Sequence, residues 1–257
     1  MVGTNKSLGQ HWLKNREILD EIADLALNFS ADQNSEKTEV CVEIGPGLGT
    51  LTSSLLKRFG KVIAVEYDKR LADNLPKSFP GKNLKVVNDD ILKYDFDSIK
   101  EPYVVAGNIP YYITSPIIEK LLNLKNPPVI IVLLVQKEVA ERILSEKETL
   151  LSLFVKNRAL VSAGPVVDKT EFTPSPKVDS EVIIMKPKSP EISEEVFDLI
   201  KTGFKAPRKK LIHNLSGLKS KQELKTVFDS LGISADVRPG DLDLKVWQEL
   251  FSKITAA

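Results

Sequence analysis

The sequence predicts an α/β protein in which a doubly wound parallel sheet precedes a small helical domain. Short runs rich in Val and Ile alternate with amphipathic segments over the first two thirds of the chain. Glycine, proline, asparagine or aspartate bounds these runs, which is typical of buried parallel strands. After a linker-like stretch, Pro187–Pro190, the apolar residues recur only at helical spacing.

The predicted elements follow one another in the order that produces parallel strands joined by crossover helices. The expected parallel strands are Val40–Ile44, Lys61–Glu66, Leu84–Val87, Tyr103–Gly107 and Val129–Val135. The expected helices are Arg16–Asn28, Thr50–Phe59, Lys69–Leu75, Ser115–Leu122 and Gln136–Leu144. A late strand, Glu181–Lys186, follows a proline-rich loop and is expected to be antiparallel. These elements predict a first domain over residues 1–188.

A second, helical domain is predicted over residues 189–257. Its expected helices carry apolar residues at a spacing of three and four, and they are Glu194–Phe204, Arg208–Leu215, Lys221–Leu231 and Leu244–Ile254.

The composition excludes several classes of protein. No apolar run approaches the roughly 20 residues of a membrane helix, and Met1–Lys6 is not followed by a signal-peptide core. A single cysteine, Cys41, leaves no internal disulfide and no multi-cysteine zinc site. We therefore expect a cytoplasmic protein without a membrane or metal site. The net charge of +1 means that any contact with RNA depends on local basic clusters.

A glycine-rich turn, Glu43–Thr50, follows the first predicted strand. Glycines at this point allow a tight turn and the close approach of a ligand. Thr50 stands where the dinucleotide fingerprint has its third glycine, which disfavours an NAD-dependent oxidoreductase and favours a nucleoside ligand without a pyrophosphate. Glu66 ends the second strand and can accept both ribose hydroxyls, whereas Asp90 follows the third strand and can accept an adenine amine. The alternative is an ordinary strand-to-helix turn with solvated acids.

The fourth strand ends in Asn108-Ile109-Pro110-Tyr111. Methylation of an exocyclic amine requires that its delocalised lone pair be turned toward the methyl donor. Asn108 and the carbonyls beside Pro110 are acceptors that can do this, and the Tyr111 ring can stack on a flipped base. A sulfonium donor needs no strong base, so catalysis would consist mainly of positioning. The alternative is an Asn-x-Pro turn without a chemical role.

Five segments together resemble the ribosomal RNA adenine dimethyltransferases, and they are Ser7–Leu13, Val42–Thr52, Asn108–Pro116, Gln136–Ala140 and Phe172–Ser180. The resemblance implies a Rossmann-like class I methyltransferase fold with S-adenosyl-L-methionine as the cofactor. It further implies N6,N6-dimethylation of adjacent adenines near the 3′ end of small-subunit ribosomal RNA during ribosome biogenesis.

The same resemblance implies roles for individual residues. The cofactor contacts would come from His11, Leu13, Gly45, Gly47, Glu66, Asp90 and Asn108. The catalytic turn would comprise Asn108, Ile109, Pro110 and Tyr111, and Phe172 would stack on the other face of the target adenine. His11 stands where the family usually has Asn, and its imidazole can still make one hydrogen bond.

A basic helix is expected to begin the second domain, and by resemblance it would contact RNA through Lys205, Arg208, Lys209 and Lys210. The implied partner is small-subunit RNA within a pre-ribosomal particle, bound by a monomer. The C-terminal segments Leu231–Ile233, Arg238–Pro239, Leu242 and Trp247–Leu250 resemble the small-subunit enzymes. Two alternatives are a large-subunit methyltransferase that confers antibiotic resistance and a non-catalytic ribosome-assembly factor with the same fold.

Overall fold

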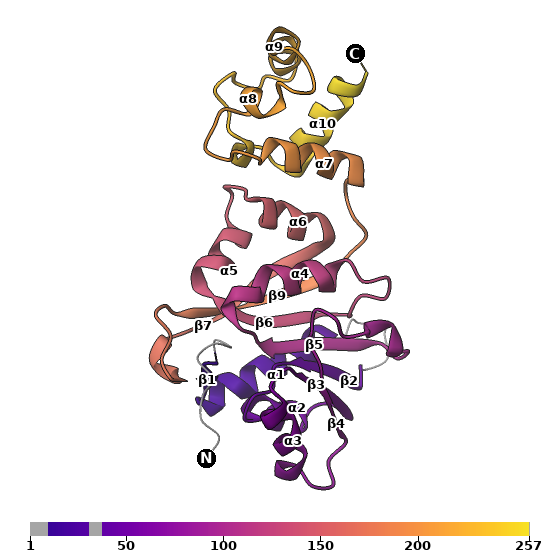
Figure 1. The fold of residues 1–257 in the computed structure, drawn as a ribbon, viewed down its shortest axis with the longest axis vertical. Coiled ribbons are helices and arrows are strands. Elements are labelled where there is room, and N and C mark those ends of the chain that lie inside the picture. Colours follow the sequence, from indigo (N-terminus) through magenta and orange to yellow (C-terminus); the bar gives the residue numbers. More distant parts are fainter. Residues whose placement is uncertain (1–9, 31–37, 257) are drawn as a thin grey trace. The chain divides into compact units, whose positions relative to one another are not determined.

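The computed structural model describes residues 10–30 and 38–256 (Figure 1). The motif segment Ser7–Gly9 lies outside the described residues. Contacts group the chain into two compact units. The first unit holds residues up to Ala140 together with Leu160–Pro187, and the second holds Glu141–Ala159 together with the chain from Lys188 onward.

This grouping differs from the predicted division at residue 188 in one segment. Residues 141–159 belong with the second unit, because α6 (Leu150–Arg158) packs against α7 (Glu194–Gly203). The Phe154 and Phe197 rings meet edge to face at 5.7 Å between centroids. No periodic signal in the sequence connects two segments so far apart along the chain.

A seven-stranded sheet forms the core of the first unit (Figure 1). Its strands are β2 (Val40–Ile44), β3 (Lys61–Glu66), β4 (Leu84–Asn88), β5 (Tyr103–Asn108), β6 (Ile131–Gln136), β7 (Ala159–Val167) and β9 (Ser180–Pro187). They are arranged in the order β4-β3-β2-β5-β6-β9-β7. The pairs among β2 to β6 are parallel and β9 is antiparallel to β6, which confirms the predicted doubly wound fold and the antiparallel late strand.

Helices cover both faces of this sheet, which explains why most residues of its central strands are apolar. The helices of this part of the chain are α1 (Arg16–Ser30), α2 (Thr50–Leu55), α3 (Lys69–Ser78), α4 (Thr114–Leu122) and α5 (Lys137–Leu144). Ile22 and Ala26 of α1 belong to one buried cluster with Val104 and Val132 of the sheet. Figure 1 shows α4 on the opposite face of the sheet from α1.

A second, two-stranded sheet joins β1 (Trp12–Leu13) to β8 (Phe172–Thr173) in antiparallel register. Leu13 lies opposite Phe172, and both side chains are buried. The sequence does not predict these strands, because two residues carry no recognisable periodicity. The pairing brings the N-terminal segment beside residues 172–174, which matters for the site below.

The second unit is helical, as expected after the linker, and adds α8 (Leu211–Leu215), α9 (Lys221–Ser230) and α10 (Leu244–Thr255) to α6 and α7. Trp247 of α10 is fully buried against Phe204. None of the helices among the described residues combines the length and the apolar character needed to cross a bilayer.

The basic helix expected from Arg208 onward begins only at Leu211, so Arg208–Lys210 lie in the preceding turn. Pro207 cannot donate a backbone hydrogen bond. The Asn214 amide nitrogen donates to the carbonyls of Gly203 and Ala206, which holds the chain in a turn after α7. The exposed basic side chains are therefore presented by a turn and not by one face of a helix.

Candidate active site

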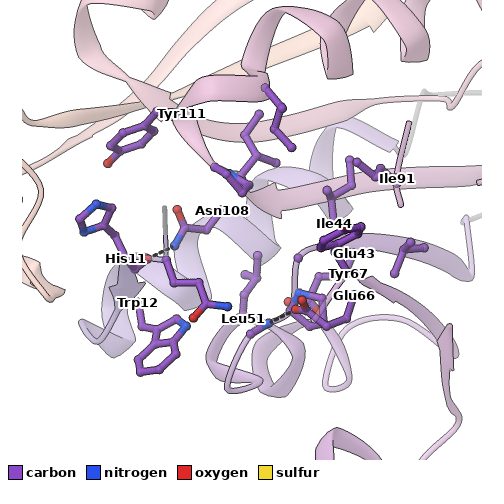
Figure 2. A pocket seen from close by; sticks show the side chains of 18 of the residues that line it. His11, Trp12, Glu43, Ile44, Leu51, Glu66, Tyr67, Ile91, Asn108 and Tyr111 are labelled. Atoms are coloured by element: carbon purple, nitrogen blue, oxygen red, sulfur yellow. Dashed lines mark hydrogen bonds between the residues drawn. The ribbon is translucent and has the colours of Figure 1, made fainter. Parts of the chain in front are cut away.

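A pocket of about 340 Å³ opens at the carboxyl ends of the central strands of the first unit. Parallel sheets of this kind bind ligands where the strand order reverses, here between β2 and β5. Nine of the predicted site residues line the pocket, and they are His11, Gly45, Gly47, Glu66, Asp90, Asn108, Ile109, Pro110 and Tyr111. Figure 2 shows that side chains from the N-terminal segment, β2, β3 and β5 face one space.

Glu66, at the end of β3, is held in place by backbone donors. The N–H groups of Gly47 and Asp68 donate to its two carboxylate oxygens at 3.0 and 2.8 Å. Burial raises the pKa of Glu66, and these two backbone hydrogen bonds oppose the rise. Because a carboxylate has about four acceptor sites, each oxygen can still accept a ligand hydroxyl. The Glu66 side chain is thus oriented before any ligand arrives.

The glycine turn reaches this position only with a left-handed backbone. Gly47 has φ +59°, and a Cβ atom there would lie 3.0 Å from Trp12 Nε1. A side chain at position 47 would therefore be strained and would also push against the indole. The turn keeps the Gly47 N–H directed at Glu66, so the glycine and the acid form one element of the pocket.

Glu43, the fourth residue of β2, forms part of the pocket floor and was not singled out from the sequence. It accepts a hydrogen bond from the Thr52 hydroxyl at 2.6 Å. Burial, with a smaller contribution from the nearby Glu66 carboxylate, raises the pKa of Glu43 to about 8, although the hydrogen bond from Thr52 opposes the rise. A neutral acid at pH 7 thus lies close to Glu66. The signal in the sequence was an acid inside an otherwise apolar strand.

Asn108, the last residue of β5, has a defined amide orientation. Its Nδ2 atom donates to the carbonyl oxygen of His11 at 2.9 Å, as the dashed line in Figure 2 shows. A carbonyl oxygen only accepts, so the amide nitrogen faces His11 and the Oδ1 atom is left as an acceptor. An acceptor at this point of the pocket suits a substrate amine.

Tyr111 is fixed beside Asn108 on the 3₁₀ turn Tyr111–Ile113. Its hydroxyl shares a hydrogen bond of 2.7 Å with the hydroxyl of Ser180. Burial raises the pKa of Tyr111, so the phenol stays neutral at ordinary pH. The ring can therefore offer an uncharged face for stacking.

The chain matches the family model described as "Ribosomal RNA adenine dimethylase" over residues 1–255. A ribosomal RNA small subunit methyltransferase A from Picosynechococcus sp. is 36% identical over 97% of this chain and 96% of its own length. The chain belongs to the ribosomal RNA adenine dimethylase family. Among solved structures, a dimethyladenosine transferase from Plasmodium falciparum is similar at 29% identity and a TM-score of 0.78, with 95% of this chain and 97% of the other covered. The 23S rRNA methyltransferase ErmE shares the fold at 24% identity and a TM-score of 0.75, with coverage of 95% and 99%.

His11 contacts two other parts of the site, the loop at Pro174 and the Tyr111 ring. Its Nδ1 atom lies 2.7 Å from the carbonyl oxygen of Pro174, so Nδ1 carries the hydrogen. Its ring is stacked near Tyr111, with 5.9 Å between centroids and 17° between planes. Figure 2 shows the two rings on the same side of the pocket.

Two predicted site residues of this dimethylase do not line the pocket with their side chains. Leu13 and Phe172 are 0% and 2% exposed and belong to the hydrophobic core. Leu13 can therefore offer a ligand only its backbone. Phe172 is packed in the core and is not among the residues that line the pocket, and its contact with the target adenine stays a prediction.

The second unit of this dimethylase carries a basic cluster, which we define as Arg208, Lys209, Lys210, His213 and Arg238. These residues and Asp236 line a shallow hollow. Lys210 and Asp236 form an ion pair at 2.5 Å whose side chains are 50% and 73% exposed. Lys205, also expected to bind RNA, is exposed but is not among the residues that line the hollow. His213 and Arg238 were not predicted to bind RNA. Arg238 comes from a distant stretch of chain, so its place beside Arg208 is not visible in the sequence.

Proposed function

We propose that this protein transfers methyl groups from S-adenosyl-L-methionine to N6 of two adjacent adenines near the 3′ end of small-subunit ribosomal RNA. Membership of the ribosomal RNA adenine dimethylase family supports the reaction. The relatives that are similar over nearly the whole chain are named small subunit methyltransferases, which supports small-subunit RNA as the substrate. We further propose that the protein acts as a cytoplasmic monomer on a pre-ribosomal particle.

The observation that carries this proposal is the orientation of the Asn108 amide. The His11 carbonyl holds the amide nitrogen, so the Asn108 Oδ1 atom is available to accept a hydrogen from the target amine. The carbonyl of Ile109 or Pro110 would accept the second hydrogen. With both hydrogens held in the first transfer, the amine lone pair turns out of conjugation with the purine ring, and after each transfer the methylated nitrogen loses one proton to solvent. This is catalysis by orientation, which can lower a barrier by several kcal/mol.

The pocket suits the cofactor by the chemistry of its donors and acceptors. Glu66 would accept the ribose hydroxyls, Asp90 would accept the adenine amine, and the glycine turn leaves room for the nucleoside. S-adenosylmethionine supplies, when bound, a methyl group on a positively charged sulfonium. The protein's own residues then need only hold the amine in line and keep water from the pocket.

The RNA would be held in part by the basic cluster. Exposed Arg and Lys side chains bind phosphates without regard to sequence and with an affinity that falls as salt rises. The near-neutral net charge favours a substrate that is recognised by shape within a particle over naked RNA. Tyr111 would stack on the flipped adenine.

Mass spectrometry of ribosomal RNA from cells with and without the protein tests the proposal. Dimethyladenosine in small-subunit RNA should disappear without the protein and should return with the wild-type gene but not with Asn108→Ala. Dimethyladenosine lost from large-subunit RNA instead would indicate a large-subunit methyltransferase. If neither RNA changed, a non-catalytic assembly role would replace the proposal.

A further inference from the structure

The turn after β4 carries Asp90 and is held at both ends by side chains. At its start, Asp90 Oδ1 accepts the N–H of Leu92 at 2.9 Å, and the Asp90 carbonyl accepts the N–H of Tyr94 at 2.9 Å. At its end, the Lys120 ammonium donates to the carbonyl oxygens of Leu92 and Tyr94 at 2.9 and 2.8 Å. The segment is thus capped like one turn of helix, with an acid at its N-terminal end and a cation at its C-terminal end.

Lys120 reaches this turn from α4, the helix that follows the Asn108–Tyr111 segment. Its ammonium also lies 5.6 Å from the centroid of the Phe96 ring. Burial lowers the pKa of Lys120, and the carboxylates of Asp90, Asp89 and Asp95 oppose that shift. A long side chain held by two carbonyls and a ring has little remaining freedom. It therefore defines where the turn sits against α4.

We propose that Lys120 is a positioning residue that holds Asp90 for recognition of the adenine amine of S-adenosylmethionine. This inference rests on the function proposed above. Asp90 lines the pocket, and its Oδ1 atom already accepts the N–H of Leu92. The turn therefore fixes the position in which the carboxylate can accept a hydrogen bond from the adenine amine. The side chains of Glu66 and Asn108 lie on other strands and are held by other groups, the Glu66 carboxylate by the N–H groups of Gly47 and Asp68 and the Asn108 amide by the His11 carbonyl. Loss of Lys120 therefore weakens recognition of the adenine and leaves methyl transfer at saturating cofactor largely intact.

The test compares two product analogues by calorimetry. S-adenosylhomocysteine has the amine, whereas S-inosylhomocysteine has a carbonyl in its place. The wild type should prefer the first by about tenfold, the value of one hydrogen bond to a charged acceptor. Lys120→Met should bind S-adenosylhomocysteine about fivefold to tenfold more weakly and should lose most of the preference, with kcat at saturating S-adenosylmethionine within about twofold.

Two further variants complete the test. Lys120→Arg retains a cation with several donors and should recover part of the preference. Lys93→Met removes an exposed lysine from the same turn and should change neither the preference nor kcat. If Lys120→Met does not fold, Lys120→Gln, which retains a donor, takes its place and should show a smaller loss of preference.

The remaining outcomes distinguish a positioning role for Lys120 from a purely structural role and from a failure of the proposed function. An unchanged preference in a folded Lys120→Met protein overturns the inference, and a lower melting temperature with the preference retained assigns Lys120 a purely structural role. Equal binding of both analogues by the wild type also overturns it, because Asp90 would then not read the amine, although methyl transfer could still be measured. A wild type that binds neither analogue removes the proposed function itself.

Discussion

The pocket and the basic cluster differ in how their charged groups meet the solvent. In the pocket, Glu43 and Glu66 are 1% and 6% exposed, and each carboxylate accepts hydrogen bonds from the protein before any ligand binds. In the basic cluster, an ion pair joins Lys210 to Asp236, and both side chains are at least half exposed. The carboxylates of the pocket are therefore oriented before a ligand binds. The exposed side chains of the basic cluster can change conformation, and solvent and salt screen their charges.

This difference has a consequence for mutations. A buried acceptor that loses its partner cannot turn to water, so a single change in the pocket has a large and specific effect. Exposed cations attract phosphates through their combined electrostatic field, which salt weakens. Several of them must therefore be removed before RNA binding changes measurably.

The largest effect is expected for Asn108→Ala. The side chain both donates to the His11 carbonyl and offers its own carbonyl to the substrate amine. We expect the single-turnover rate of methyl transfer to fall by about a thousandfold, or about 4 kcal/mol, with the far-ultraviolet circular dichroism unchanged. A folded variant with near-normal turnover would disprove the orientation mechanism while leaving the family assignment intact.

Glu66→Ala should come next, with the affinity for S-adenosylmethionine reduced about tenfold to a hundredfold in calorimetry. The change removes the acceptor for the ribose and also frees the N–H groups of Gly47 and Asp68. Glu39→Ala is the matched control, because Glu39 also accepts a glycine N–H, that of Gly60, but does not line the pocket. Equal affinities of the two variants would remove Glu66 from the cofactor site.

Glu43 should make the stability of the protein depend on pH. Its pKa is about 8 in the folded protein and near 4.5 when unfolded, so the folded form holds a proton that the unfolded form releases. The contribution of Glu43 to stability is therefore full below pH 4.5 and is lost as the pH rises to about 8. Relative to Glu43→Gln, the free energy of unfolding of the wild type should fall by up to about 1.4 kcal/mol per pH unit in this range. Parallel pH profiles in urea unfolding would show that Glu43 is ionised in the folded state.

Mutations in the basic cluster should have a smaller effect than those in the pocket. Replacing Arg208, Lys209 and Lys210 together by Ala should weaken binding to immature small subunits about tenfold at low salt and less at higher salt. The slope of log Kd against log salt should decrease by about two, while cofactor affinity stays the same. The matched control replaces Lys219, Lys221 and Lys225, which carry the same charge but do not line the hollow. Equal slopes for the two triple variants would reduce Arg208–Lys210 to a solvated surface.

The smallest effect is expected for Tyr111→Phe. The ring face that would stack on the base is kept, and only the hydrogen bond to Ser180 is lost. Methyl transfer should slow by about twofold to threefold, against the larger loss of roughly 1–3 kcal/mol for Tyr111→Ala. A loss as large in Tyr111→Phe as in Tyr111→Ala would mean that the hydroxyl, and not the ring, is what the reaction needs.

The sequence by itself determined six of the seven strands of the central sheet, all except β7, and the residues at the carboxyl ends of the parallel strands. Buried parallel strands must be apolar along their whole length, and a glycine turn or an acid that interrupts this pattern stands out, as Gly47 and Glu66 do. Parallel strands also end at one edge of the sheet, so the sequence alone places Glu66, Asp90 and Asn108 in one group.

Only the tertiary structure decided how these groups are held. The pairing of β1 with β8 buries Phe172 and brings the His11 carbonyl to Asn108, and two-residue strands leave no periodic trace in the sequence. Lys120 donates to the carbonyls of Leu92 and Tyr94, which lie almost thirty residues away along the chain. Arg238 and Arg208 are about as far apart in sequence and line the same hollow. Contacts of this kind depend on where whole elements pack, because hydrogen bonds and charges act over a few ångströms in space regardless of separation along the chain.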